Sequence, residues 1–129
     1  MPEEVGFIGL GNMGGRMAVR LAEQGRSVVG YDVVPGLADK ARARVAGSIA
    51  EVAAATGHEV VLRSRSQAGA DAMVASLAKA LAKQVEKGKR TDAEAAEISS
   101  RVRATTHLGE LVDVDLVIES VVEDRKSVV

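Results

Sequence analysis

Three glycines, Gly9, Gly11 and Gly14, constrain the fold of this chain more than any other feature of its sequence. They follow a short apolar run, 5–10, which is typical of a buried parallel strand. Apolar residues then recur every four positions, and this spacing predicts an amphipathic helix that ends at Gly25. The apolar stripe of this helix consists of Met13, Met17 and Leu21. The glycines therefore lie in the turn between a predicted strand and a predicted helix.

A second apolar run, 27–31, predicts another strand, and Asp32 lies at its carboxyl end, 23 positions after Gly9. In such a unit the first glycine permits the tight turn and the second lets the backbone approach a pyrophosphate. The third lets the helix pack close to the strand. The helix N-terminus favours phosphate groups, and an acid in the position of Asp32 accepts hydrogen bonds from a ribose.

This pattern predicts a dinucleotide-binding site, and Asp32 favours NAD over NADP because an acid repels a 2′-phosphate. The predicted cofactor-binding residues of this unit are Gly9, Leu10, Gly11, Asn12, Met13, Gly14 and Asp32. An alternative stays open, in which the glycines serve only the packing of helix on strand. A second alternative concerns Ser64, which two arginines flank and which could accommodate the 2′-phosphate of NADP, or could lie in a plain solvated turn.

The rest of the chain continues the alternation of strands and helices. Residues 36–56 predict either one long crossover helix or two helices hinged near Gly47. A helical hairpin follows, in which Thr91 and Glu94 form a capping box for the second helix. The further predicted strands are 59–63, 102–108 and 114–120. The fold class is therefore α/β, with a Rossmann-like, doubly wound parallel sheet of about five strands and an inserted helical hairpin in a single domain, 1–129.

Composition excludes several classes of function. The formal net charge is −1, which gives no sign of binding to nucleic acid. Cysteine is absent, and the two histidines, His58 and His107, are too isolated to form a histidine-based metal site. No apolar run is long enough to span a membrane, and Glu3 and Glu4 replace the basic residues of a signal peptide. We expect a soluble, cytoplasmic protein.

The stretch "GFIGLGNMGGRMAVRLAEQGRSVVGYD" resembles the N-terminus of the β-hydroxyacid dehydrogenases, such as 3-hydroxyisobutyrate dehydrogenase, over residues 1 to about 46. The later stretches "LAKQVEKGKRTDAEAAEISS" and "DLVIESVVED" resemble the NAD-binding domain of 3-hydroxyacyl-CoA dehydrogenase, over about 47–124. The second resemblance implies that Ser120 and Glu123 lie near the nicotinamide end of the cofactor. Alternatively, Glu119 and Glu123 are only solvated loop charges.

The two resemblances together predict a chimera that is joined near 46–52, although 44–62 also fits a plain continuation of the hydroxyacid family. The catalytic residues of both resembled families lie beyond the part of each family that is seen here. We therefore expect an NAD(H)-binding module without turnover, engineered or recombined. The alternatives are a folded chimera that binds no cofactor and an active dehydrogenase. A sheet without its usual edge strands also leaves a homodimer open.

Overall fold

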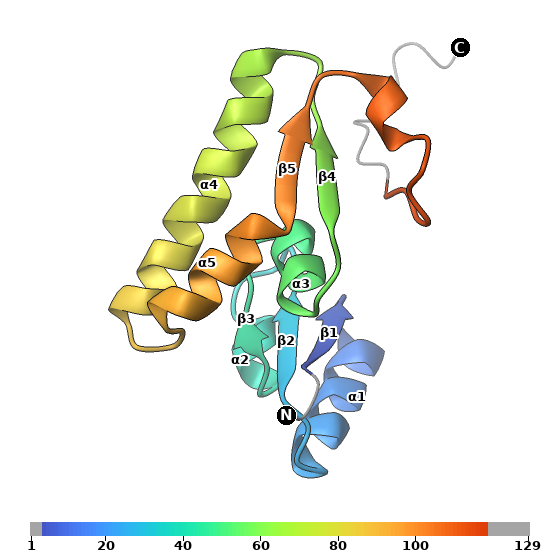
Figure 1. Ribbon diagram of the computed structural model, residues 1–129. Helices are drawn as coiled ribbons and strands as arrows, with labels where there is room; N and C mark the ends of the chain where they lie inside the picture. Colours follow the sequence, from blue (N-terminus) through green and yellow to red (C-terminus); the bar gives the residue numbers. More distant parts are fainter. Residues whose placement is uncertain (1–3, 119–129) are drawn as a thin grey trace, which may run out of the picture.

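The computed structural model describes residues 4–118 of the chain, and its elements alternate between strands and helices (Figure 1). The strands are β1 (Val5–Ile8), β2 (Val28–Tyr31), β3 (Arg44–Val45), β4 (Val60–Arg63) and β5 (Val102–Thr105). The helices are α1 (Asn12–Glu23), α2 (Leu37–Lys40), α3 (Ile49–Ala55), α4 (Gln67–Glu86) and α5 (Asp92–Ser100), and a short 3₁₀ helix, η1, spans Leu108–Leu111. The predicted α/β class is confirmed, and so is the hairpin of α4 and α5 between two strands.

The described strands are all parallel to their neighbours, but they form two sheets rather than one. The first sheet has the order β1-β2-β3, and the second pairs β4 with β5. Residues 114–118 of the predicted strand 114–120 have no regular structure, and 119–120 lie outside the described residues. The arrangement thus differs from the single sheet of about five strands that the apolar runs predict.

Helix α3 lies between the two sheets (Figure 1). On one side it packs closely on β1, because Val52 and Thr56 occupy the space that a side chain at Gly6 would need. On the other side Ala54 is buried in a cluster that joins α3 to the hairpin. The small residues of α3 and β1 therefore bring the first sheet and the hairpin onto one helix.

The segment 36–56 is neither of the two helical arrangements that its apolar spacing predicts. Helix α2 ends after one turn, the strand β3 follows, and α3 begins after Gly47 and Ser48. Strand β3 pairs with β2, where Val29 and Gly30 lie opposite Arg44 and Val45. Pairing with an existing strand has overridden the helical periodicity at this place.

Helix α1 buries small residues instead of its methionines. Ala18 is fully buried, whereas Met13 and Met17 are 78% and 55% exposed. Strand β1 is at the edge of its sheet, and α1 packs on β1, β2 and α2, so the helix buries only the side that faces these elements. The predicted apolar stripe through Met13 and Met17 is wrong for this reason.

The hairpin of α4 and α5 follows its sequence signals closely. Ser66 caps the start of α4, and Gly88 adopts a left-handed conformation just beyond the helix end. Thr91 and Glu94 form the predicted capping box. Leu77, Leu81 and Ile98 are buried between the helices and β5. Among the described helices, none is both long and apolar enough to cross a membrane.

Candidate functional site

The glycine loop between β1 and α1 forms a tight turn that only glycine allows. Gly9 adopts a left-handed conformation with φ of 90°, and its N–H donates to the carbonyl oxygen of Tyr31 at 3.0 Å. A side chain at Gly14 would overlap the carbonyl oxygen of Gly9. Both glycines therefore have the roles that their spacing predicts, since one permits the turn and the other the close packing of α1 on it.

The start of α1 is open. No side chain caps the helix at Gly11, and the first turn contains no acidic residue. A methyl group added at Gly11 would have no atom of the described chain within 4 Å. The first N–H groups of a helix lack partners within the helix and carry partial positive charge, so an uncapped start is suited to phosphate oxygens.

Asp32 holds the loop from the end of the neighbouring strand. Its Oδ2 accepts the N–H of Leu10 at 2.8 Å, and its Oδ1 accepts the N–H of Val34 at 2.8 Å. The N–H of Leu10, and to a lesser extent that of Val34, lowers the pKa of the Asp32 carboxyl below its usual value. An ionised carboxylate can accept about four hydrogen bonds, so two such positions are left for ribose hydroxyls.

The structure brings most of the predicted site residues together at the carboxyl ends of β1 and β2. Leu10 contributes its backbone, since its side chain is buried in the core, whereas Asn12 and Met13 are exposed on the first turn of α1. The predicted residues Ser120 and Glu123, and Glu119 beside them, lie outside the described residues. The described site therefore comprises the glycine loop, the first turn of α1 and Asp32.

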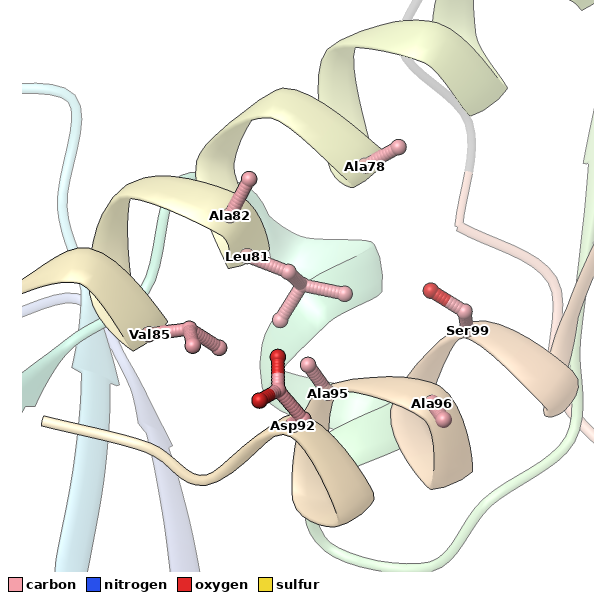
Figure 2. Close-up of a pocket in the computed structure, with 8 residues that line it drawn as sticks. All are labelled: Ala78, Leu81, Ala82, Val85, Asp92, Ala95, Ala96 and Ser99. Atoms are coloured by element: carbon pink, nitrogen blue, oxygen red, sulfur yellow. The ribbon is translucent and has the colours of Figure 1, made fainter. Parts of the chain in front are cut away.

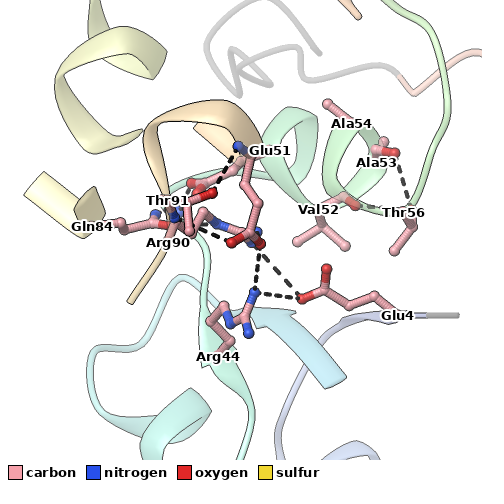
Figure 3. Close-up of polar contacts among 12 residues, drawn as sticks. Glu4, Arg44, Glu51, Val52, Ala53, Ala54, Thr56, Gln84, Arg90 and Thr91 are labelled. Atoms are coloured by element: carbon pink, nitrogen blue, oxygen red, sulfur yellow. Dashed lines mark hydrogen bonds and ion pairs between the residues drawn. The ribbon is translucent and has the colours of Figure 1, made fainter. Parts of the chain in front are cut away.

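The start of α3 is closed by the chain itself. Glu51 is completely buried, and its carboxylate accepts the N–H of Gly47 and the side-chain amide of Gln84 (Figure 3). The hydroxyl of Ser48 accepts the N–H of Glu51 at 3.1 Å. A carboxylate and a hydroxyl of the protein thus occupy the positions that an anion would need at this helix start.

Arg90 extends this cluster and is a residue that the sequence analysis missed. It is almost fully buried, and its Nε donates to Oε1 of Gln84 at 2.7 Å. Its guanidinium lies 3.9 Å from both Glu4 and Glu94, and Arg44 lies 3.4 Å from Glu4 (Figure 3). The cluster connects the hairpin with the first sheet, and local sequence patterns do not indicate this connection, because Glu4 and Arg44 come from parts of the chain distant from Arg90.

Two hollows of the described surface lie away from the glycine loop. One, of about 310 Å³, is a groove between α4 and α5, and half of the residues that line it are alanines (Figure 2). Its lining residues are Ala78, Leu81, Ala82, Val85, Asp92, Ala95, Ala96 and Ser99. The other, of about 190 Å³, lies beside the start of α3, where Glu51 already fills the polar positions. Neither hollow gathers the groups that a reaction needs.

The remaining candidates are accounted for by local structure. Ser66 accepts the N–H of Gly69 at the start of α4, and Arg63 and Arg65 are exposed beside it. His58 and His107 are exposed. Within residues 4–118, no group of three or more metal-ligating side chains lies close enough together to hold a metal ion.

Comparison with known proteins finds one family. The model of the 3-hydroxyacyl-CoA dehydrogenase NAD binding domain matches residues 44–127. A 3-hydroxybutyryl-CoA dehydrogenase of Clostridioides difficile is 47% identical over 76 residues, which are 59% of this chain and 27% of that protein. A probable 3-hydroxybutyryl-CoA dehydrogenase of Deinococcus radiodurans is 39% identical over 83 residues, 64% of this chain and 30% of that protein. The chain therefore spans less than a third of these relatives.

Solved structures are also similar to this chain. The crystal structure of 3-hydroxybutyryl-CoA dehydrogenase from Escherichia coli K12 superposes with a TM-score of 0.49 and 22% identity, over 89% of this chain and 18% of that chain.

The position of the family match matters for the site. The match begins at residue 44, in β3, so it includes the closed start of α3. The glycine loop and Asp32 precede it. The residues whose geometry suits a dinucleotide thus lie outside the matched segment, and the helix start inside the matched segment is filled by Glu51.

Proposed function

The chain belongs to the family of 3-hydroxyacyl-CoA dehydrogenase NAD binding domains, and we propose from this premise that it binds NAD(H) at the loop before α1. The observation that carries the proposal is the contrast between an uncapped helix start at Gly11 and a helix start that Ser48 caps and the carboxylate of Glu51 covers. A phosphate group needs N–H donors that are not already bound to the protein's own side chains.

Different residues of the loop would bind different parts of NAD. Gly11 lets the pyrophosphate approach the backbone, and the first turn of α1 directs N–H groups and a positive dipole end at it. Asp32 accepts the ribose hydroxyls and fixes the loop through the N–H of Leu10. When bound, NAD supplies a nicotinamide that carries hydride.

We propose further that the chain joins two related pieces near 46–52 and has no turnover of its own. Support comes from the match that begins at residue 44 and from the division of the strands into two sheets, of which the first comprises β1, β2 and β3. The 1–46 piece would derive from a β-hydroxyacid dehydrogenase, as its glycine loop suggests. Measurable oxidation of 3-hydroxybutyryl-CoA or of 3-hydroxyisobutyrate would contradict the absence of turnover.

Calorimetric titration of the whole chain with NAD, NADP and ADP-ribose tests the proposed site. We expect NAD and ADP-ribose to bind alike, because the described site contacts only the adenosine and pyrophosphate part, and NADP to bind more weakly. Gly11→Val should abolish this binding without unfolding the chain, since the position is open. Binding that survives Gly11→Val would place the site elsewhere.

A second candidate is a folded protein that binds no cofactor. It is favoured by the edge position of β1, which leaves the carboxyl end of the first sheet with only β2 and β3 beside it. The same titration separates the two candidates, because a chain that unfolds cooperatively but gives no heat with any of the three ligands would support the second.

A further inference from the structure

Leu10 is the residue of the glycine loop whose side chain is buried. It is 2% exposed, whereas Gly9, Gly11 and Asn12 on either side of it are exposed. Glycine has no Cβ and leaves the backbone free to adopt many conformations, so the flanking glycines alone do not fix the shape of the loop. The Leu10 side chain is therefore the part of the loop that the apolar core can hold.

The Leu10 side chain packs on β2, the strand that ends at Asp32. A methyl group at Gly30 of β2 would lie 3.0 Å from Cδ1 of Leu10 and 3.0 Å from Cβ of Ala43. The missing side chain at Gly30 thus leaves the space that Leu10 fills. The apolar cluster around Leu10 contains small residues from α2 and the turn that follows it, among them Ala38 and Ala43.

The backbone of Leu10 contacts the end of the same strand. Its N–H donates to Oδ2 of Asp32 at 2.8 Å, and the N–H of Val34 donates to Oδ1 of the same carboxylate at 2.8 Å. Donors on both oxygens fix the rotation of the carboxylate, so its remaining acceptor positions point in defined directions. The Leu10 N–H reaches Asp32 only while the loop keeps its place beside β2.

We propose that Leu10 is a positioning residue of the candidate site, whose buried side chain holds the loop so that its N–H orients the Asp32 carboxylate for a ribose. This inference rests on the proposed binding of NAD(H) at the loop. The Leu10 side chain is buried in the core, so it acts through Asp32. A carboxylate that is already oriented loses little freedom when a ribose binds, and this preorganisation raises affinity.

Amide hydrogen exchange, followed by NMR on the whole chain, tests the positioning without any cofactor. The amide of residue 10 should be protected in the parent, because it donates to Asp32. Leu10→Ala and Asp32→Ala should each speed its exchange at least about tenfold. Unchanged protection in Leu10→Ala would overturn the positioning role and would leave the proposed binding of NAD(H) untouched.

Calorimetric titration with NAD and NADP measures the consequence for binding. Leu10→Ala should weaken NAD binding about fivefold. It should weaken NADP binding less, because a carboxylate that is free to turn no longer faces the 2′-phosphate. In an Asp32→Ala background, Leu10→Ala should cost no further NAD affinity, since Leu10 acts through that carboxylate.

The failures of the two proposals are distinguishable in this titration. An equal loss of affinity for both cofactors, or a full further loss in the Asp32→Ala background, would make Leu10 a merely structural residue and overturn the positioning role. A folded parent chain that binds no NAD would overturn the proposed function and this inference with it.

Leu81→Ala is the matched control. Leu81 is also 2% exposed, but its apolar cluster joins α3 to the hairpin. Both substitutions remove the same atoms from an apolar cluster, whereas only Leu10→Ala should change the exchange at residue 10 and the NAD affinity. If circular dichroism shows that Leu10→Ala is unfolded, Leu10→Val and Leu81→Val replace the pair, because they remove a smaller part of the side chain. Equal effects of the two leucine substitutions on NAD affinity would overturn the proposal.

Discussion

Two helix starts of this chain look alike in sequence and differ in structure. Helix α1 and helix α3 each follow a parallel strand and a glycine, Gly11 in one case and Gly47 in the other. At α1 the nearest carboxylate, Asp32, approaches from the neighbouring strand and binds the loop at Leu10. At α3 the carboxylate of Glu51 belongs to the helix itself and binds back to Gly47.

The difference shows that a helix start can bind an anion only where side chains of the protein have not already taken its first N–H groups. A carboxylate from another strand steadies the loop and leaves the first helical N–H groups accessible. At α3 the hydroxyl of Ser48 accepts one of those groups, the N–H of Glu51, and the carboxylate of Glu51 accepts the N–H of Gly47 just before the helix. Glycine and a helix terminus are therefore not enough to define a phosphate site.

We expect the largest effect from a substitution that disturbs the packing of α1 against the glycine loop. Gly14→Ala places a methyl group against the carbonyl oxygen of Gly9, which is backbone and cannot turn aside. We expect this variant to lose at least about 3 kcal/mol of unfolding free energy in urea titration, and to lose NAD binding.

Gly11→Ala is the matched control, because its backbone angles are open to alanine and its methyl group would meet no atom within 4 Å. Its unfolding free energy should stay within about 0.5 kcal/mol of the parent, while NAD binding weakens. Equal stability of the two variants would show that α1 does not pack on the loop as described.

We expect the next largest effect from removing the Glu51 carboxylate at the start of α3. Glu51→Ala leaves the N–H of Gly47 and the amide of Gln84 without their acceptor inside the protein. Gln84 is buried and Gly47 is exposed, so one buried donor loses its partner, which costs about 1–3 kcal/mol by urea titration. NAD should still bind once per folded chain.

Glu97→Ala is the control for this substitution, because Glu97 is exposed and bound only to Arg101, and it should change stability by less than about 1 kcal/mol. A second equivalent of NAD bound to Glu51→Ala would mean that the α3 start is a phosphate site which Glu51 merely covers.

The smallest expected effect concerns the charge of Asp32. Backbone N–H groups hold its pKa below the usual value, so the carboxylate stays ionised at neutral and mildly acidic pH. Its hydrogen bonds are fully present above the unfolded pKa of about 4, and they are lost as the pH falls through the lower folded pKa. NAD binding should therefore be constant from pH 7 to about pH 5 and weaken only below about pH 4.

Asp32→Asn should bind NAD about tenfold more weakly at pH 7 and should lack this acid dependence. Calorimetry at each pH, with circular dichroism to confirm folding, measures both. Glu94 also has a lowered pKa, chiefly through the N–H of Thr91, so acid unfolding must be followed separately. An Asp32→Asn variant with the same acid dependence as the parent would assign it to another group.

Short-range sequence patterns predicted most of the features that depend on neighbouring residues. The turn at Gly9, the close packing at Gly14, the capping box of Thr91 and Glu94 and the hairpin all follow from residues within a few positions of each other. Strand β3 was missed because two residues carry no usable periodicity. The methionine stripe of α1 was misassigned because the spacing predicts a face and does not identify what covers it.

Sequence patterns alone are enough to predict the α/β class, the loop before α1 and the acid at the end of β2, and to identify the family of residues 44–127. The folded chain was needed to show that the described strands form two sheets, that Arg90 pairs the hairpin with Glu4, and that Glu51 covers the start of α3 from inside the protein. The physical reason is distance along the chain. Turns and caps depend on neighbours, whereas pairing, burial and the filling of a helix start depend on residues that only the folded chain brings together.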